Sequence, residues 1–284
     1  MNLMSTSLLF PQQEGKRKTQ ILVKEQKIGD TTPFVIAGPC SIQSYEQLKN
    51  AAKIAKQFGA QALRGGAFKP RTSPYAFQGL KQEGLEILKE VGKELDLITV
   101  SEVIDCRDIE AVFNYADILQ VGSRNMHNSS LLKELGMLKK PILLKRGFAA
   151  TYEEFLLAAE YILSGGNQEV ILCERGIRTF ETYTRNTLDL NAVAALKELS
   201  HLPIIVDPSH GTGKRSLVLP MARAAIAAGA DGLIVEMQMH PETSISDAMQ
   251  TIGPKEFQTM MEEILKVHNA LFSDGLKKNQ NSSS

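Results

Sequence analysis

The chain has 284 residues, of which 43% are hydrophobic and 23% charged, so it can bury a large core and fits one large α/β domain or two small ones. Lys and Arg together number 32, as do Asp and Glu, so the bulk charge gives no reason to expect nucleic acid or an anionic membrane as a partner. The three cysteines are too few and too odd for a disulfide framework, and no stretch approaches the ~20 apolar residues of a membrane span, so we expect a cytoplasmic protein.

The two ends of the chain lie outside its main pattern. Residues 19–25 are apolar enough to form one arm of a small hairpin that would close the bottom of a barrel, and the segment before residue 31 is too short for an independent regulatory domain. Residues 273–284 form a polar tail. We therefore expect an N-terminal extension over 1–30, a catalytic domain over 31–272 and a tail over 273–284.

Between these ends one pattern repeats eight times, a short apolar run followed by a segment with helical periodicity. The apolar runs cover residues 33–39, 60–66, 97–103, 116–123, 141–147, 169–176, 202–209 and 231–237. The helical segments cover residues 45–59, 80–95, 107–116, 129–136, 152–166, 188–200, 216–229 and 254–272. Ser44 can cap the first helix, and Thr151 with Glu154 can form a capping box on the fifth.

Continuous apolar strands that alternate with amphipathic helices indicate an α/β protein whose parallel sheet is covered by helices. Eight such units over about 240 residues match the size of a single (β/α)8 TIM barrel. A doubly wound open sheet is the alternative, because the repeat does not by itself prove that the sheet closes.

Cations gather in residues 63–74, LRGGAFKPRTSP, which contain Arg64, Lys69 and Arg71. Two glycines and two prolines make this segment a loop of restricted geometry, which can aim its charges at phosphate or carboxylate. A solvated basic loop explains this segment alone equally well.

Further cations follow other strands of the predicted barrel. They are Arg124, Lys145, Arg146 and Arg175. The carboxyl ends of barrel strands face the active site, so a neutral protein has concentrated positive charge on one rim. This arrangement favours a small phosphorylated substrate with several negative charges over a chance distribution of surface charge.

A second set of residues has the chemistry of metal ligands. Cys40, His210, Glu236 and Asp247 follow the first, seventh and eighth strands and would meet on the same rim. Sulfur, imidazole and two carboxylates suit manganese, iron, cobalt or zinc, whereas a pure magnesium site would not normally recruit a thiolate. His240 stays possible because it shares a loop with Asp247.

Other functions compete with a metal-dependent reaction. Lys145 on the fifth strand could be the Schiff-base lysine of a barrel aldolase, which would ignore chelators. A phosphosugar-binding regulator without catalysis is disfavoured because it would not need both a metal set and a cation set. GTGKRS, residues 211–216, lacks the glycine and hydroxyl positions of a nucleotide-binding loop.

Six segments, each at a strand end, resemble one enzyme family. They are AGPCSIQS, LRGGAFKPRTSP, QVGSRNM, LLKRG, ERGIRTFETYTRNTLDL and IVDPSHGTGKRS. In this order they resemble 3-deoxy-arabino-heptulosonate 7-phosphate synthase, in the type I beta branch related to 3-deoxy-octulosonate 8-phosphate synthase. The resemblance implies a (β/α)8 barrel that condenses phosphoenolpyruvate with erythrose 4-phosphate in the first step of the shikimate pathway to aromatic amino acids.

The resemblance also assigns roles by motif. The divalent metal ligands are Cys40, His210, Glu236 and Asp247, with manganese first and iron, cobalt or zinc as alternatives. The residues around phosphoenolpyruvate are Arg64, Lys69, Arg124, Lys145 and Arg175, and Asp207 joins the substrate-binding set at the end of the seventh strand. The aldose phosphate segment is Lys69, Pro70, Arg71, Thr72 and Ser73. Lys69 is the candidate for proton transfer to the aldehyde oxygen, so Lys69, Cys40 and His210 form the catalytic set.

Several details distinguish this chain within the family. The KPRTS segment favours the four-carbon aldehyde, with an octulosonate synthase acting on arabinose 5-phosphate as the alternative. After Glu236 the chain reads EMQMHP where the family usually shows Glu-Val-His-Pro, which displaces His240 by two positions. The short N-terminus lacks the ferredoxin-like or chorismate mutase domain of many relatives, so we expect an enzyme insensitive to aromatic end products unless a partner controls it. A homo-oligomer, either dimer or tetramer, is implied as well.

Overall fold

The computed structural model describes residues 8–15, 17–69, 73 and 75–272. The expected polar tail at 273–284 and three residues of the expected aldose phosphate segment, Pro70, Arg71 and Thr72, lie outside the described residues.

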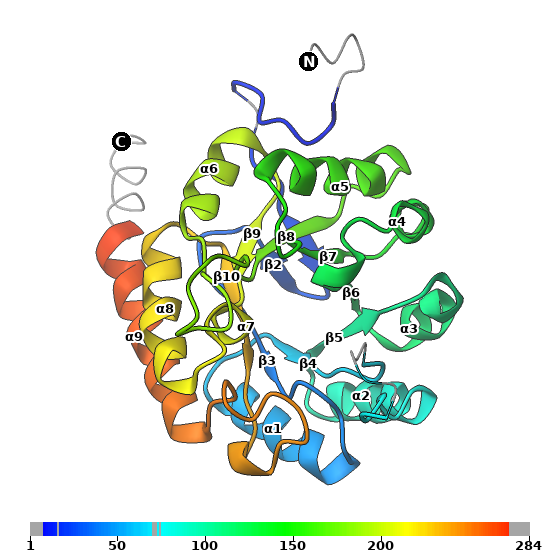
Figure 1. Cartoon of the computed structure of the whole chain (residues 1–284), viewed down its shortest axis with the longest axis vertical. Coiled ribbons are helices and arrows are strands. Elements are labelled where there is room, and N and C mark those ends of the chain that lie inside the picture. Colours follow the sequence, from blue (N-terminus) through cyan, green and yellow to red (C-terminus); the bar gives the residue numbers. More distant parts are fainter. Residues whose placement is uncertain (1–7, 16, 70–72, 74, 273–284) are drawn as a thin grey trace, which may run out of the picture.

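Within this part of the chain, eight parallel strands close into a barrel in the order β10-β3-β4-β5-β6-β7-β8-β9, and helices surround it (Figure 1). The strands are β3 (Phe34–Gly38), β4 (Ala62–Arg64), β5 (Ile98–Val103), β6 (Ile118–Val121), β7 (Ile142–Lys145), β8 (Val170–Glu174), β9 (Ile204–Val206) and β10 (Gly232–Glu236). The predicted TIM barrel is confirmed, and the open sheet is excluded because β10 pairs with β3 along its whole length.

The seam between the last and first strands depends on a glycine. Gly232 lies opposite Phe34 in the register of β10 and β3. A Cβ at Gly232 would approach the Phe34 carbonyl oxygen to 2.0 Å, so no larger residue fits without moving the backbone. The register continues to Glu236 opposite Gly38, which brings the end of β10 beside the loop that carries Cys40.

The helices occupy the predicted segments with small shifts at their ends. They are α1 (Tyr45–Gln57), α2 (Gln82–Glu94), α3 (Ile109–Tyr115), α4 (Ser129–Gly136), α5 (Tyr152–Ser164), α6 (Asn191–Leu199), α8 (Arg215–Ala227) and α9 (Pro254–Phe272). The Ser44 cap and the capping box of Thr151 and Glu154 are both present. No helix in the described part of the chain is long and apolar enough to cross a membrane.

One α-helix of the described residues was not predicted. Residues Pro208–Thr212 form the short helix α7 directly after β9. Asp207 caps it by accepting a hydrogen bond from the backbone N–H of His210 at 2.9 Å. Pro208 stands at the first helical position, where its missing N–H costs nothing. The helix fixes the direction of the His210 side chain relative to the barrel.

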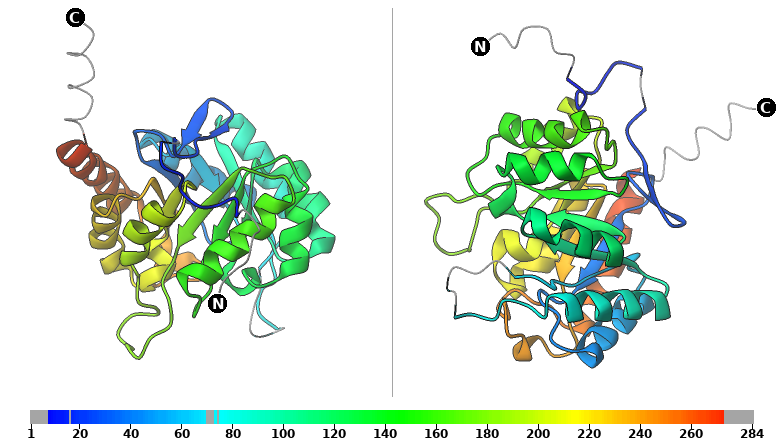
Figure 2. Two further views of the ribbon diagram at one scale, coloured as in Figure 1. Left: turned by 90° about the horizontal axis from the view of Figure 1, so that it is seen from above. Right: turned by 90° about the vertical axis from the view of Figure 1, so that its right-hand side faces the viewer.

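A small hairpin covers the end of the barrel away from the strand-end loops. It consists of β1 (Ile21–Val23) and β2 (Gln26–Ile28), which pair antiparallel. Ile21, Val23 and Ile28 are buried in the same apolar cluster as the inward side chains of the barrel strands. Figure 2 (left) shows the hairpin in blue at one end of the barrel and the long loop after β8 at the other. The loops that follow the strands therefore lie at the end of the barrel that the hairpin does not cover.

Candidate active site

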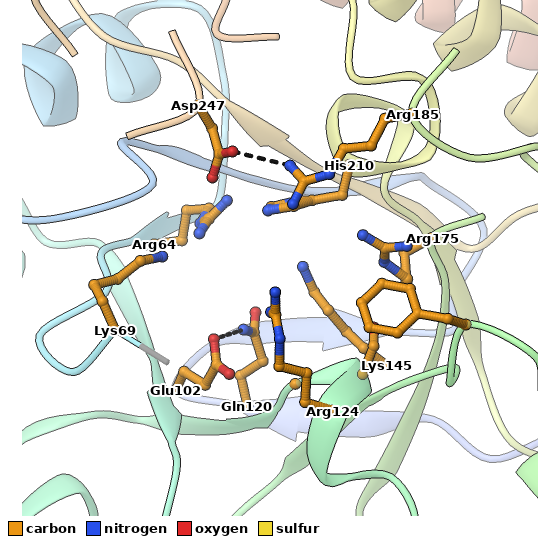
Figure 3. Close-up of a pocket in the computed structure, with 13 residues that line it drawn as sticks. Arg64, Lys69, Glu102, Gln120, Arg124, Lys145, Arg175, Arg185, His210 and Asp247 are labelled. Carbon is orange, nitrogen blue, oxygen red and sulfur yellow. Dashed lines mark hydrogen bonds and ion pairs between the residues drawn. The ribbon is translucent and has the colours of Figure 1, made fainter. Parts of the chain in front are cut away.

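The functional side chains come from the carboxyl ends of the barrel strands and surround one cavity, as expected for this fold (Figure 3). Its described lining residues are Arg64, Lys69, Glu102, Gln120, Gly122, Ser123, Arg124, Lys145, Phe148, Arg175, Arg185, His210 and Asp247. In Figure 3 the labelled arginines and lysines point inward from several strands toward a common space. All five cations that the resemblance assigns to phosphoenolpyruvate are in this lining.

The structure brings the four expected metal ligands together. One ligand atom from each of Cys40, His210, Glu236 and Asp247 lies within 4.8 Å of the others. Cys40 Sγ donates to Asp247 Oδ2 at 3.1 Å, and His210 Nε2 lies 3.2 Å from Glu236 Oε1. A cluster of sulfur, nitrogen and two oxygens at this spacing suits a divalent ion of borderline softness. The chain's own donor set therefore fits a metal.

His210 is oriented by Asp207. The carboxylate Oδ2 of Asp207 lies 2.7 Å from His210 Nδ1, so Nδ1 carries a proton, and in the neutral ring Nε2 then has a lone pair. Burial lowers the pKa of His210 below its ordinary value, although the nearby carboxylates of Asp207 and Glu236 oppose this. A neutral imidazole with Nε2 aimed at the cluster is the form that binds a metal ion.

Cys40 sits between a cation and two acids. Lys69 donates from Nζ to both the Sγ and the carbonyl oxygen of Cys40, each at 3.0 Å. Burial, followed by the negative charge of Glu236, raises the pKa of the Cys40 thiol to about 12. A bound divalent ion would instead lower the pKa of this thiol, because a thiol that coordinates a metal ion is deprotonated. Lys69 then also faces the thiolate.

The two carboxylates are held from outside the cluster. Glu236 is fully buried and accepts from Arg64 Nη1 at 3.0 Å and from Gln250 Nε2 at 2.7 Å. Asp247 accepts from Arg185 Nη1 at 2.9 Å. Burial would raise the pKa of Asp247, but the neighbouring His210, Cys40, Arg185 and Lys69 side chains together outweigh it and hold that pKa at about 2.

The cations opposite the cluster form an anion pocket. Arg175 is only 3% exposed, and no described carboxylate lies within ion-pair distance of it. Its guanidinium lies 4.7 Å from the centre of the Phe148 ring, over which Arg124 and Arg178 also lie. Burial lowers the pKa of Arg175. A desolvated guanidinium without a protein counterion is prepared for an anionic ligand.

Lys145 has a partner that bears on its role. Its Nζ lies 2.5 Å from Asp207 Oδ2, and both residues are nearly or fully buried. An amine that attacks a carbonyl must offer its lone pair, whereas this one donates to a carboxylate. The ion pair favours anion binding by Lys145 over the Schiff-base role.

Several expected residues lie outside the described cavity wall. Asp207 was expected in the substrate-binding set, but its carboxylate is 0% exposed and is occupied by His210 and Lys145, so it contacts the site through them. Ser73 is exposed and its hydroxyl accepts from the Tyr75 N–H at 3.3 Å. The possible ligand His240 is 69% exposed and takes no part in the described metal group.

Several residues of the described site were not singled out from the sequence, and three of them make the contacts given above. Arg185 lies in the quoted ERGIRTFETYTRNTLDL segment, Phe148 follows the quoted LLKRG, and Gln250 lies just beyond Asp247. The sequence signal that could have found them is their position within or next to those motifs. Their contacts run through long side chains from irregular loops, which periodicity does not describe.

Known proteins resemble this chain in sequence and in structure. The sequence model of the DAHP synthetase I family matches residues 14–272. A phospho-2-dehydro-3-deoxyheptonate aldolase of Thermotoga maritima is 50% identical over 261 residues, which cover 92% of this chain and 76% of that protein. The crystal structure of the phospho-2-dehydro-3-deoxyheptonate aldolase (DAHP synthase) from Thermotoga maritima superimposes with a TM-score of 0.91 at 47% identity, over 94% of this chain and 79% of that one. A 2-dehydro-3-deoxyphosphooctonate aldolase of Syntrophobacter fumaroxidans is 28% identical over 261 residues, 86% of this chain and 90% of that protein.

Proposed function

Because the chain belongs to the DAHP synthetase I family, we propose that it condenses phosphoenolpyruvate with erythrose 4-phosphate to give 3-deoxy-arabino-heptulosonate 7-phosphate and inorganic phosphate. This transferase reaction begins the shikimate pathway, which supplies chorismate and the aromatic amino acids. One observation of the structure carries the proposal. A metal-ligand group and an anion pocket share a single cavity, with His210 and Asp247 in its wall beside the cations.

The anion pocket suits phosphoenolpyruvate, which carries a carboxylate and a phosphate on the same carbon, C2. Arg124, Lys145 and Arg175 point into the cavity from three strand ends (Figure 3). We assign them, with Arg64 and Lys69, to the two anionic groups. Fixed cations in a site of low dielectric stabilise developing charge more strongly than water does. Together they would hold C3 of phosphoenolpyruvate against the aldehyde.

The condensation joins C3 of phosphoenolpyruvate to the aldehyde carbon of erythrose 4-phosphate. Water adds at C2, and the resulting hemiketal phosphate releases inorganic phosphate. Lys69 is our candidate for the proton that the aldehyde oxygen takes up, because its ammonium lies beside Cys40 in the cavity. The aldose phosphate would contact Ser73 and the neighbouring Pro70, Arg71 and Thr72.

The metal group would be formed by Cys40, His210, Glu236 and Asp247. A divalent ion bound there supplies Lewis-acid polarisation of an oxygen or orients a water molecule. We propose manganese first, because it accepts the two carboxylates readily, with iron, cobalt and zinc as alternatives. Asp207 contributes by fixing the tautomer of His210.

Two further aspects are proposals of the same kind. A cytosolic location is supported by three unpaired cysteines, one of which must stay reduced to bind a metal. A homo-oligomer, dimer or tetramer, is implied by the family resemblance. The exposed Phe180, Tyr183 and Met249 give apolar surface for such contacts.

The aldehyde substrate is tested by following the loss of phosphoenolpyruvate absorbance with purified protein. Erythrose 4-phosphate and arabinose 5-phosphate are compared at equal concentrations with manganese present. The proposal predicts turnover with the four-carbon sugar and little with the five-carbon sugar. A preference for arabinose 5-phosphate would instead assign the protein to the octulosonate synthases.

A further inference from the structure

Outside the four metal-ligand residues, two side chains connect the carboxylates to each other. Gln250 is 2% exposed, and both ends of its amide are used. Its Nε2 donates to Glu236 Oε2 at 2.7 Å, and its Oε1 accepts from Arg185 Nη1 at 3.2 Å. The same Nη1 donates to Asp247 Oδ1 at 2.9 Å. One continuous chain of hydrogen bonds therefore runs from Glu236 through Gln250 and Arg185 to Asp247.

In this chain of bonds, the two oxygens of each carboxylate have different partners. Glu236 uses Oε2 for Gln250, so that Oε1 is the oxygen that lies 3.2 Å from His210 Nε2. Asp247 uses Oδ1 for Arg185, so that Oδ2 is the oxygen that lies 3.1 Å from Cys40 Sγ. Each acid thus presents one oxygen to the centre of the group. Fixing the outer oxygen sets the rotation of the carboxylate and the direction of the inner one.

The backbone around Asp247 needs such support. Asp247 has φ of +56°, a left-handed conformation that is uncommon for residues other than glycine. A turn holds it, because the Gln250 N–H and the Thr251 hydroxyl both donate to the Asp247 carbonyl oxygen, at 3.1 and 3.0 Å. Gln250 therefore acts on Asp247 through its backbone and through Arg185.

Arg185 also joins this loop to the helix that carries His210. The Arg185 N–H donates to the Thr212 carbonyl at 2.9 Å, and the Asn186 amide donates to the His210 carbonyl at 2.9 Å. The loop that bears these two residues follows β8 and begins beside Arg175 in the anion pocket. Figure 3 shows Arg185 reaching Asp247 from this side. The same loop thus contacts both halves of the site.

We propose that Arg185 and Gln250 are positioning residues that hold Glu236 and Asp247 in the arrangement a divalent ion requires. The inference rests on the proposed metal role of those two acids. It assigns no substrate contact to Gln250, and it predicts an effect on metal affinity that can be measured without turnover.

The test measures the manganese affinity of the purified protein by competition with a coloured chelator. Gln250→Met keeps the size of the side chain and removes both hydrogen bonds to its amide. Losing an outer partner of a metal ligand commonly weakens metal binding by about 10- to 100-fold. We expect a loss in that range for Gln250→Met and for Arg185→Met, with Arg185→Lys recovering part of it.

A matched control lies in the same loop. Gln238 is also 2% exposed, but its amide bonds to Gln47 and to the His240 carbonyl and reaches neither carboxylate. Gln238→Met should leave manganese affinity within about twofold of the wild type, because its amide bonds to neither acid and to neither of the two positioning residues. An equal loss in the control would overturn the inference, since it would mean that any loosening of this loop weakens the metal.

The remaining outcomes distinguish a failure of the proposed metal site from a failure of the positioning role alone. If the wild-type protein binds no manganese, iron, cobalt or zinc, the proposed metal site fails. If the wild type binds and Gln250→Met binds equally well, only the positioning role fails. Arg185 is 40% exposed, so its Met variant should fold and carries the test even if Gln250→Met does not. The double variant should lose less than the product of the two single losses, because both act in one chain of bonds.

Discussion

Replacing Asp207 with Asn tests how the site is held together. The Asp207 carboxylate is fully buried and accepts from Lys145 Nζ at 2.5 Å and from His210 Nδ1 at 2.7 Å through the same oxygen, Oδ2. Its Oδ1 accepts the His210 N–H at 2.9 Å. Asparagine keeps the size but loses the charge and one acceptor. If the asparagine oxygen accepts the His210 backbone N–H, the asparagine NH2 group faces two other donors, Lys145 Nζ and His210 Nδ1.

The magnitude follows from the burial of the pair. Removing one charged partner of a buried ion pair typically costs about 3–5 kcal/mol, because the other charge is left uncompensated. That is a large part of the roughly 5–15 kcal/mol that stabilises a folded protein. A second effect should appear in metal affinity. An amide NH2 near Nδ1 of His210 favours the tautomer with a proton on Nε2, which removes the lone pair that faces the metal group.

The assay is urea unfolding followed by circular dichroism, with a chelator present so that metal binding does not contribute to stability. Asp105→Asn is the control, because Asp105 forms an exposed ion pair with Arg107 and should leave the unfolding midpoint nearly unchanged. Manganese affinity is measured on the same proteins. Equal unfolding free energies for the two variants, together with unchanged metal affinity in Asp207→Asn, would refute the assigned role of Asp207.

Three further predictions concern single side chains. Cys40→Ser should weaken metal binding and turnover together, while Cys106→Ser, at an exposed cysteine, should change neither. Full activity of Cys40→Ser with no loss of manganese affinity would contradict the ligand assignment. Phe148→Ala should raise the KM for phosphoenolpyruvate more than the KM for erythrose 4-phosphate, because three guanidinium groups lie over the Phe148 ring. Phe148→Tyr should restore the KM for phosphoenolpyruvate. Equal rises for both substrates would argue against an anion-pocket role. Gly122→Ala should lower both thermal stability and activity, since its Cβ would lie 2.1 Å from the Glu102 carboxylate in the cavity wall; a variant with wild-type melting temperature and kcat would show that Glu102 moves aside freely.

The sequence predicted the repeat but not the closure of the sheet. Eight apolar runs indicate eight buried strands, yet the pairing of β10 with β3 joins residues almost 200 positions apart, which no local pattern encodes. The short helix α7 escaped prediction for a related reason. Its five residues are too few to show a helical period, and its start depends on the cap from Asp207.

The site could be predicted to the extent that it depends on strand ends. Cys40, Arg64, Lys145 and Glu236 end strands or follow them directly, so a closed barrel brings them together whatever the loops do. Arg185 and Gln250 could not be placed in this way, because they reach the acids from loops whose paths depend on tertiary contacts.

The changed EMQMHP segment shows the same limit on a smaller scale. Gln238 occupies a buried position, where its amide bonds to Gln47 and to the backbone of the loop, and His240 lies on the surface. Despite the change, Glu236 and Asp247 lie in one group with Cys40.

The most direct test of a metal-dependent condensation is a titration of chelator-treated protein with manganese. Bound metal and the consumption of phosphoenolpyruvate with erythrose 4-phosphate are measured in the same samples. The single described ligand group predicts no turnover at the start and a rise in proportion to bound metal that saturates at one ion per chain. Undiminished turnover in the metal-free protein would contradict the account and point back to a reaction carried by the lysines and arginines alone.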